Sequence, residues 1–464
     1  MIPLRGLGLA LLICFLFQVA AYHKYSQDKF IEGDGYCYLN LALSFYSWLK
    51  TGTGHWFDIV RSPLLGIFIP PDLELARFAM NFYLLLTVAI LYAISYKLTR
   101  NALASSLAVM SYGTIVYLLD FTRKVMSDLP AVMLFLLAFY FYLSRSQRGS
   151  LLFASFGALA FTLRPDTAIL LLPLFLLSFK RNRKMFFHSF SVFVLIALVG
   201  EFALEVVYFG QPNYSPFNFF FTNLLTEDFK VTRVEDASLL WYVENSILTE
   251  PLFFSISLIS LFLLLKEKRW DILSVFLLLT LSFALAPKID PRVYMVKVFS
   301  ILTPALSFLY RKLLALNELP AISLTILILF SHLNGLLQLT YPHWDPKEAI
   351  TFVLASTPKN TTICSNIIPV ITYYAKRDRK LATFSLRQVE AFDYTTTEEY
   401  QLIEVELKER GCGLLLYLTH PAITNDREDL VIWLKRRYQF DVLSSGDYPT
   451  LVFYLKSSPI EKSI

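Results

Sequence analysis

Residues 79–97 read AMNFYLLLTVAILYAISYK, an apolar stretch with no charged side chain before Lys97. A helix needs roughly 20 mostly apolar residues to cross the hydrocarbon core of a bilayer. Because that core holds no water, the backbone polar groups of a crossing segment must be satisfied within the segment, as they are in a helix. The stretch therefore predicts a membrane-spanning helix and decides the class of the fold.

Apolar runs of similar length recur along the chain and predict an α-helical polytopic membrane protein. The predicted spans are 6–22, 79–97, 101–119, 127–144, 185–207, 247–265, 270–286, 294–310 and 318–338. The apolar stretch 150–179 is interrupted by Arg164, Pro165 and Asp166. Since proline breaks a helix and charges resist burial in lipid, this stretch predicts a hairpin of two short helices. The total is about eleven membrane segments of the length a bilayer requires.

The composition agrees with this class. Apolar residues make up 55% of the chain and charged residues 17%, with 41 Phe and 26 Tyr. An average soluble domain is about 25% charged, and aromatic rings favour the membrane–water interface. The net charge of +5 is modest, and no basic run is interleaved with aromatic residues. The sequence therefore predicts membrane lipids as partners and no nucleic acid.

Short basic clusters predict the orientation, because cytoplasmic connections carry an excess of Lys and Arg. With a cytoplasmic N-terminus, the inside connections hold Lys97, Arg100, Arg145, Arg148, Lys180, Arg181, Arg183, Lys184, Lys266, Lys268, Arg269, Arg311 and Lys312. This agreement requires 150–179 to return to its starting side, as a hairpin does. We therefore expect the C-terminal region outside, in the plasma membrane of a prokaryote or the endoplasmic reticulum membrane of a eukaryote.

Two domains are predicted. Residues 1–339 form the transmembrane domain, whose first outer loop, 23–78, contains an amphipathic interfacial helix at 36–50. Residues 340–464 form a small soluble α/β domain outside the membrane, because strand-like and helix-like segments alternate there. These segments are Thr361–Cys364, 399–409, Leu414–Leu418, 426–437 and Leu451–Leu455, with Thr396 and Glu399 spaced as a capping box and Gly411 as a helix stop.

The cysteines and histidines predict no metal site. None of the four cysteines forms a CxxC pair, and the six histidines neither cluster nor form an HExxH motif. Cys364 and Cys412 both fall in the predicted soluble domain and would be able to pair in an oxidising compartment. We expect instead two separately buried thiols.

Polar groups near the outer ends of the spans are the candidates for function, because charge at membrane depth is costly. Glu32-Gly33-Asp34-Gly35-Tyr36 follows the first span. A carboxylate near lipid has its pKa raised by desolvation, which suits a general base. The alternative, which spacing alone favours, is that Asp34 only caps the helix at 36–50.

Three arginines on the same predicted face are candidates for binding a lipid phosphate, because a guanidinium can bind phosphate through two hydrogen bonds. Arg61 lies in the first loop, Arg164 in the break of the hairpin, and Arg292, followed by Tyr294, before a late span. Each has a structural alternative: interfacial pairing for Arg61, a pair with Asp166 for Arg164, and snorkelling for Arg292.

Asp120 and Asp128 lie between the third and fourth spans. The sequence Ser127-Asp128-Leu129-Pro130 is typical of a helix start. Capping by Ser127 or Asp128 explains this pattern as well as a chemical role does, so both interpretations stay open.

Taken in chain order, these segments resemble the GT-C glycosyltransferase superfamily, in particular its dolichyl-phosphate-mannose protein mannosyltransferase and lipid A aminoarabinose transferase-like branch. The resemblance covers roughly residues 1–340. It is carried by Gly33-Asp34-Gly35-Tyr36, Arg61-Ser62-Pro63-Leu64, Asp128-Leu129-Pro130, Leu159-Ala160-Phe161-Thr162-Leu163-Arg164 and Arg292-Val293-Tyr294. Many relatives have a second acidic residue where Gly35 follows Asp34 here, and the WWDYG signature of oligosaccharyltransferases is absent.

The resemblance implies transfer of a sugar from a polyprenyl-phosphate donor of the dolichyl-phosphate type to an acceptor hydroxyl, with inversion, on the non-cytoplasmic face. The acceptor would be a protein or a lipid-linked molecule. The resemblance implies catalytic roles for Asp34, as the base, and Asp128; donor-phosphate binding by Arg61, Arg164, Arg292 and Tyr294; and support from Glu32, Tyr36 and Asp120. A divalent metal is possible, though many relatives work without one.

Three other classes of protein compete with this interpretation. A transporter or lipid flippase predicts broken helices in matching positions of two halves, and we find one broken hairpin without a counterpart. An O-antigen ligase or polymerase usually places its large outer loop late among the spans, whereas here the loop follows the first span. A non-catalytic membrane scaffold would tolerate the loss of Asp34, and the enzyme would not.

Overall fold

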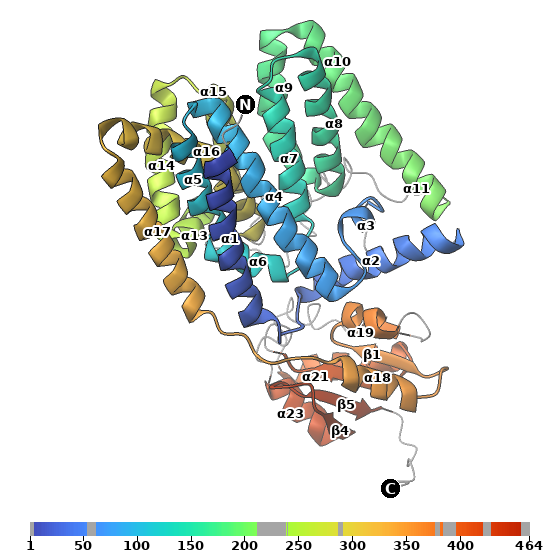
Figure 1. Ribbon diagram of the computed structural model, residues 1–464. Helices are drawn as coiled ribbons and strands as arrows, with labels where there is room; N and C mark the ends of the chain where they lie inside the picture. The colour runs from blue at the N-terminus through green and yellow to red at the C-terminus, as the bar shows by residue number, and fades with distance from the viewer. Residues whose placement is uncertain are drawn as a thin grey trace. The chain divides into compact units, whose positions relative to one another are not determined.

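The computed structural model describes residues 4–52, 62–210, 238, 240–285, 291–375, 381–383, 396–420 and 428–455. The chain divides into two compact units (Figure 1). The first, called the helical unit, comprises Met1–His23 and Leu41–Leu339. The second, called the α/β unit, comprises Lys24–Asn40 and Thr340–Ile464, so it includes part of the first outer loop as well as the C-terminal region.

Helices account for the chain up to Gln338 where it is described. They are α1 (Leu4–Tyr25), α2 (Glu32–Thr51), α3 (Leu65–Phe68), α4 (Leu73–Thr99), α5 (Ala102–Gly113), α6 (Val116–Arg123), α7 (Asp128–Tyr142), α8 (Gln147–Leu163), the 3-10 turn η1 (Pro165–Thr167), α9 (Ala168–Arg181), α10 (Arg183–Val194), the π-helical turn η2 (Leu195–Gly200), α11 (Glu201–Phe209), α13 (Trp241–Thr249), α14 (Pro251–Lys266), α15 (Trp270–Leu285), α16 (Arg292–Leu316) and α17 (Glu318–Gln338).

Several of these helices are long and apolar enough to cross a membrane. Among the described residues there are five, Gly6–Tyr25, Leu73–Thr99, Arg183–Tyr208, Arg292–Leu316 and Glu318–Gln338, and the bent pair α5 and α6 is a sixth candidate. Helices α7, α14 and α15 are apolar but shorter. The predicted class, a multi-pass helical membrane protein, is confirmed, while the number of about eleven segments stays a prediction.

Helix α16 is the central helix of the helical unit. Its span is 94% buried, against 22% to 44% for the other four. It contacts α4, α5, α7, α14, α15 and α17. The outer helices instead expose large apolar side chains, such as Phe202 and Phe330. This distribution suits a bundle whose periphery faces lipid rather than water.

The predicted span 101–119 is not one straight helix. It is bent by 53° between α5 and α6. At the bend, Thr114 Oγ1 lies 2.9 Å from Nδ1 of His332, and Nε2 of that ring lies 3.2 Å from Glu250 Oε2. Glu250 Oε1 in turn accepts a hydrogen bond of 3.1 Å from the Tyr117 amide at the start of α6. Buried side chains from distant segments thus satisfy the backbone at the break, which the local sequence could not reveal.

The helix in the first outer loop begins earlier than predicted. Helix α2 starts at Glu32 rather than at residue 36, and it ends at Thr51. Its later part packs on α11, where Tyr208 donates a hydrogen bond of 2.6 Å to Ser44. The Tyr208 ring also contacts Phe45 at a tilt and Trp48 edge-on. The early start places Asp34 inside the first turn of the helix rather than before it.

The α/β unit contains a five-stranded sheet of order β2-β1-β3-β5-β4. Its elements are α18 (Lys347–Ser356), β1 (Thr362–Ser365), α19 (Ile368–Ala375), β2 (Leu381–Thr383), α21 (Thr396–Glu409), β3 (Cys412–Leu418), α23 (Glu428–Arg437), β4 (Gln439–Leu443) and β5 (Thr450–Tyr454). Strand β1 pairs in parallel with β2 and β3, and β5 pairs antiparallel with β3 and β4. Helices α21 and α23 contribute Leu407 and Leu434 to the core beneath the sheet. Gly411 follows α21 with a φ of +65°, as expected of a helix stop.

The expectation of two separate thiols in this unit is wrong, because Cys364 and Cys412 form a disulfide. The two Cα atoms are 5.8 Å apart, within the usual range. Parallel pairing of β1 with β3 brings the cysteines together. A separation of 48 residues carries no sign of that pairing.

Replacing Cys364 and Cys412 together by Ser is expected to destabilise the α/β unit by about 2–5 kcal/mol, because the bond closes a long loop in the unfolded chain. The measurement is thermal unfolding of purified protein, with Cys37→Ser as the control, since Cys37 is a cysteine outside the Cys364–Cys412 disulfide. Alkylation of Cys364 and Cys412 in the wild type without a reductant would contradict the disulfide.

Candidate active site

Four charged side chains meet at the ends of helices in the helical unit, and we call them the ion quartet: Asp128, Arg164, Asp166 and Lys297. Asp128 is the first residue of α7, and Arg164 follows the last residue of α8. Asp166 lies in the turn η1, and Lys297 lies near the start of α16. Three stretches far apart in the sequence therefore build one charged site.

The distances within the quartet are short. Arg164 lies 3.1 Å from Asp128 and 3.3 Å from Asp166, while Lys297 lies 2.6 Å from Asp166 and 3.8 Å from Asp128. The side chains of Asp128 and Lys297 are 0% and 1% exposed. Two cations thus face two carboxylates, so the quartet as a whole is charge-balanced, which burial away from water requires.

The local sequence explains how Arg164 reaches this position. Pro165 cannot continue α8, because proline lacks the backbone N–H that a helix needs. The helix therefore ends, and Arg164 is extended, with φ −145° and ψ 98°. The Thr167 hydroxyl then donates a hydrogen bond of 2.8 Å to the Arg164 carbonyl and closes the turn. The predicted hairpin is therefore present as α8, η1 and α9. The predicted pair of Arg164 with Asp166 is present beside a second pair with Asp128.

Asp128 does not cap its helix. The residue before the helix, Ser127, is the cap, and its side chain makes no capping hydrogen bond. Neither carboxylate oxygen of Asp128 has a hydrogen-bond partner among the residues that the structure describes. The carboxylate is instead stabilised by the charges of Arg164 and Lys297. The capping interpretation is thus wrong for Asp128, and the interpretation as part of a charged site is the one that fits.

The turn that leads into α7 is strained. Val125 has a φ of +53°, in the left-handed region that β-branched residues rarely adopt. Such a conformation costs on the order of 1–3 kcal/mol and persists only where the surrounding structure imposes it. Val125 is fully buried, so packing imposes it here. Val125 lies three residues before Asp128, the first residue of α7.

The electrostatics of Asp166 follow from its neighbours. Burial alone would raise the pKa of the Asp166 carboxyl, but the Lys297 ammonium and the Arg164 guanidinium outweigh burial and hold its pKa well below the usual range. Asp166 is therefore ionised at neutral pH and serves as a fixed negative charge rather than as a proton carrier.

The other predicted site residues lie in several places. Asp120 pairs with Arg123 at 2.7 Å and with Lys124 at 3.9 Å, all on or next to α6. Arg292 is the first residue of α16. Tyr294 is buried, and its hydroxyl is 2.9 Å from that of Thr280. The structure brings together Asp128 and Arg164, and it shows the Tyr294 hydroxyl engaged within the helix packing.

Three of the predicted residues of the first outer loop, Glu32, Asp34 and Tyr36, lie at the start of α2, in the α/β unit. Glu32 and Asp34 both fall in the first turn, where the helix dipole favours negative charge. Their side chains lie outside the described residues, and so does all of Arg61. Tyr36 is buried and donates a hydrogen bond of 2.9 Å to the Lys29 carbonyl.

Sequence reasoning missed Lys297 and Arg77. Lys297 is the one charged residue in the predicted span 294–310, a signal that was available. Arg77 is fully buried on α4, where its Nε donates a hydrogen bond of 3.4 Å to the Arg123 carbonyl and an Nη lies 3.7 Å from Glu74. Arg77 lies two residues before the predicted span 79–97, so it is not a charge within a predicted span.

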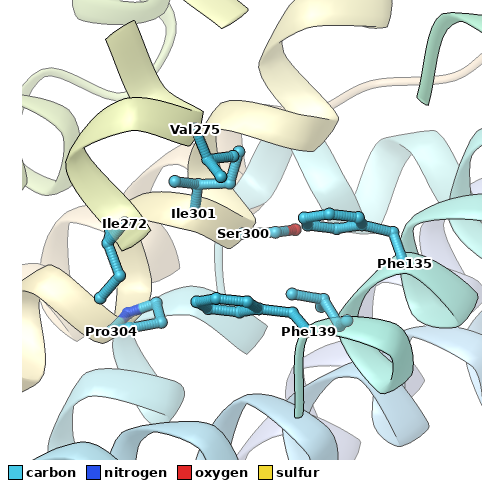
Figure 2. Close-up of a pocket in the computed structure, with 8 residues that line it drawn as sticks. Phe135, Phe139, Ile272, Val275, Ser300, Ile301 and Pro304 are labelled. Atoms are coloured by element: carbon cyan, nitrogen blue, oxygen red, sulfur yellow. The ribbon is translucent and has the colours of Figure 1, made fainter. Parts of the chain in front are cut away.

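A small pocket in the helical unit is lined by residues other than those of the quartet. Figure 2 shows it between α7, α15 and α16. It is lined by Phe135, Leu136, Phe139, Ile272, Val275, Ser300, Ile301 and Pro304. Its single hydroxyl, on Ser300, is 2.9 Å from that of Tyr112. With no charged lining residue, this pocket offers packing space and no chemistry for sugar transfer.

The described residues offer no ready metal site. No group of three or more His, Cys, Asp or Glu gathers among them in a way that could hold a metal ion. The two carboxylates of the quartet already face two cations. These two carboxylates therefore do not fit a divalent metal.

The sequence model of the Alg9-like mannosyltransferase family matches residues 34–343, more than half of the chain. The protein is thus a membrane glycosyltransferase of the GT-C class, as the sequence resemblance predicted. It belongs to the Alg9-like mannosyltransferase family. No curated protein sequence matches the chain.

Solved structures share the fold. The chain is similar to ArnT from Cupriavidus metallidurans bound to undecaprenyl phosphate, with a TM-score of 0.65 and 10% identity over 97% of this chain and 98% of that one. It is also similar to the oligosaccharyltransferase AglB from Archaeoglobus fulgidus in complex with an inhibitory peptide and a dolichol-phosphate, with a TM-score of 0.58 and 12% identity over 97% of this chain and 75% of that one. At these identities the likeness shows the fold.

Proposed function

We propose that this glycosyltransferase takes its sugar from a polyprenyl-phosphate donor, of the dolichyl-phosphate or undecaprenyl-phosphate type, and transfers it with inversion to an acceptor hydroxyl. The observation that carries the proposal is the family match, which begins at Asp34 itself and runs through the whole ion quartet. The presence of undecaprenyl phosphate and dolichol-phosphate in two structures of the same fold supports a donor of this chemical class.

The proposed step is a single displacement. The acceptor oxygen attacks the anomeric carbon while the Asp34 carboxylate removes the acceptor proton. The bond from the anomeric carbon to the phosphate oxygen breaks, and its electron pair stays on the polyprenyl phosphate that leaves. One base and a stabilised leaving phosphate suffice for this reaction, and no step of the proposal involves a metal ion.

The quartet would help to bind the donor phosphate and stabilise it as the leaving group. Arg164 keeps 10% of its side chain exposed, while Asp128 and Asp166 fix the direction of its guanidinium. A guanidinium held in this way loses little freedom when it binds a phosphate, which makes it a better stabiliser of developing charge. We propose Arg164 as a donor-phosphate ligand together with Arg61 and Arg292, with Asp128 as its partner. We also propose a role for Lys297, whose ammonium balances the charge of the Asp166 carboxylate.

We propose a cytoplasmic N-terminus and an extracytoplasmic α/β unit. Among the described residues, counting α5 with α6 and α10 with α11 as single crossings, and α1, α4, α7, α8, α9, α14, α15, α16 and α17 as one crossing each, gives an odd number. The two ends of the chain then lie on opposite sides, and the basic connections fall inside. The disulfide in the α/β unit supports the same orientation, because such bonds are rare in reducing cytoplasm.

The acceptor would be a hydroxyl on a protein or on a lipid-linked molecule. The absence of the WWDYG sequence argues against transfer of a whole glycan to asparagine. Family membership favours an enzyme over the transporter and the non-catalytic scaffold.

The proposal is tested with purified protein in lipid vesicles and a panel of synthetic polyprenyl-phosphate sugars. The expected result is release of polyprenyl phosphate from at least one donor, with water replacing the acceptor in slow turnover. A broad panel in which no donor is bound or consumed would contradict the proposed donor class.

A further inference from the structure

The segment that carries the candidate base belongs to the α/β unit. Lys24–Asn40 clusters with Thr340–Ile464 rather than with the rest of the N-terminal half. This part of the first outer loop and the C-terminal region, which begins 300 residues after Asn40, therefore form one compact body. Two sets of contacts anchor the segment in this body, one on each side of Asp34.

The first anchor precedes Asp34. The Lys29 amide donates a hydrogen bond of 2.8 Å to the Trp344 carbonyl. The Phe30 ring stacks on His420 at 4.4 Å and meets the Trp344 ring edge-on at 5.9 Å. Trp344 is fully buried and Phe30 nearly so. Backbone and ring contacts together therefore fix the chain just ahead of α2.

The second anchor follows Asp34 and involves α19. Asn40 is buried, and its Nδ2 donates a hydrogen bond of 2.9 Å to the Pro369 carbonyl. One turn earlier, the Tyr36 ring packs against Tyr373 at 5.6 Å and Tyr374 at 6.3 Å. The Tyr36 hydroxyl also donates a hydrogen bond of 2.9 Å to the Lys29 carbonyl, which links the second anchor to the first.

We infer that helix α19 is a positioning element for Asp34, and that Asn40 and Tyr374 are positioning residues for the transfer reaction. The inference rests on the proposed role of Asp34 as base. A base must lie within about 2.6–3.2 Å of the proton it takes. A misplacement of about 1 Å can lower a rate roughly 100-fold. Because Phe30 and Tyr36 are both held within the α/β unit, the backbone that carries Asp34 has little freedom to shift.

The test compares four variants of the full-length protein in the donor assay. Asn40→Asp replaces the amide that donates to the Pro369 carbonyl by a carboxylate, which cannot donate. Tyr374→Ala removes a ring that packs against Tyr36. Tyr374→Phe keeps the ring and removes only a hydroxyl that lies 3.5 Å from that of Tyr36. The control, Arg437→Ala, breaks an exposed ion pair with Glu404 in the same unit, away from α19.

For Asn40→Asp and Tyr374→Ala we expect kcat to fall about tenfold or more while the donor KM changes less than twofold, because an ill-placed base lowers the rate of the chemical step. The acid limb of the kcat–pH profile should also shift, which a smaller amount of folded protein cannot cause. Tyr374→Phe and Arg437→Ala should stay within threefold of the wild type. Thermal unfolding and resistance of Cys364 and Cys412 to alkylation report whether each variant is folded.

Two outcomes would overturn the inference. One is a wild-type kcat in both Asn40→Asp and Tyr374→Ala, and the other is a raised KM with kcat and the pH profile unchanged. Asp34→Asn, measured alongside, separates this failure from failure of the proposed function. If Asp34→Asn is inactive while the α19 variants are normal, only the positioning role is wrong. If Asp34→Asn is fully active, the proposed base is wrong and the inference falls with it.

Discussion

Asp34→Asn is expected to lower donor turnover by about 10²–10⁴-fold, the usual contribution of a general base. The amide has nearly the shape of the carboxylate, so the first turn of α2 should keep its conformation while it loses the group that accepts the acceptor proton. The measurement is kcat for release of polyprenyl phosphate in lipid vesicles, with donor binding measured separately. Binding should change little, because the phosphate contacts are proposed to come from arginines.

The matched control for this variant is Asp441→Asn. Asp441 lies on strand β4, where it accepts a hydrogen bond of 2.7 Å from the exposed Tyr454 hydroxyl. It has no part in the proposed chemistry, so its turnover should equal that of the wild type. Turnover in Asp34→Asn as fast as in Asp441→Asn would show that another group removes the proton.

Lys297→Met is expected to destabilise the helical unit by about 3–5 kcal/mol, because it leaves buried carboxylate charge without its partner. The Lys297 ammonium lies 2.6 Å from Asp166 and 3.8 Å from Asp128, and its side chain is 1% exposed. Arg164 alone would then face two carboxylates. The measurement is unfolding in a graded detergent mixture, followed by loss of helical signal.

Two companion variants make this result specific to the ion quartet. The double variant Lys297→Met with Asp166→Asn removes opposite charges together and should recover part of the lost stability. Lys312→Met is the control, because Lys312 is 55% exposed and pairs with Glu267 at the surface. Exposed pairs contribute about 0–1 kcal/mol. A Lys297→Met protein as stable as the Lys312→Met protein would mean that the quartet does not hold the helices together.

The helices of the membrane region could be predicted closely from sequence. The predicted span 318–338 coincides with α17, and 270–286 differs from α15 by one residue. Long apolar runs bounded by charges determine such helices directly. The bend at Thr114 was missed, because it depends on Glu250 and His332, which approach only in the folded chain.

The candidate site was predicted in part. The break at Pro165 and the helix start at Asp128 are local signals, and they brought Arg164 and Asp128 to attention. Their meeting with Lys297 depends on how α7, α8 and α16 pack, which a single sequence does not encode in any short motif. The same holds for the disulfide and for the anchors around Asp34, because each joins segments that are neighbours only through sheet pairing or ring packing.

The proposed single displacement is tested most directly by the anomeric configuration of the released sugar. The wild-type enzyme is given a polyprenyl-phosphate donor of known configuration, and the first sugar product is examined. Proton NMR in the first minutes of reaction distinguishes the two anomers before they interconvert. Direct displacement with Asp34 as base is expected to give the inverted anomer as the first product. A first product with retained configuration would require a covalent sugar–enzyme intermediate and would contradict it.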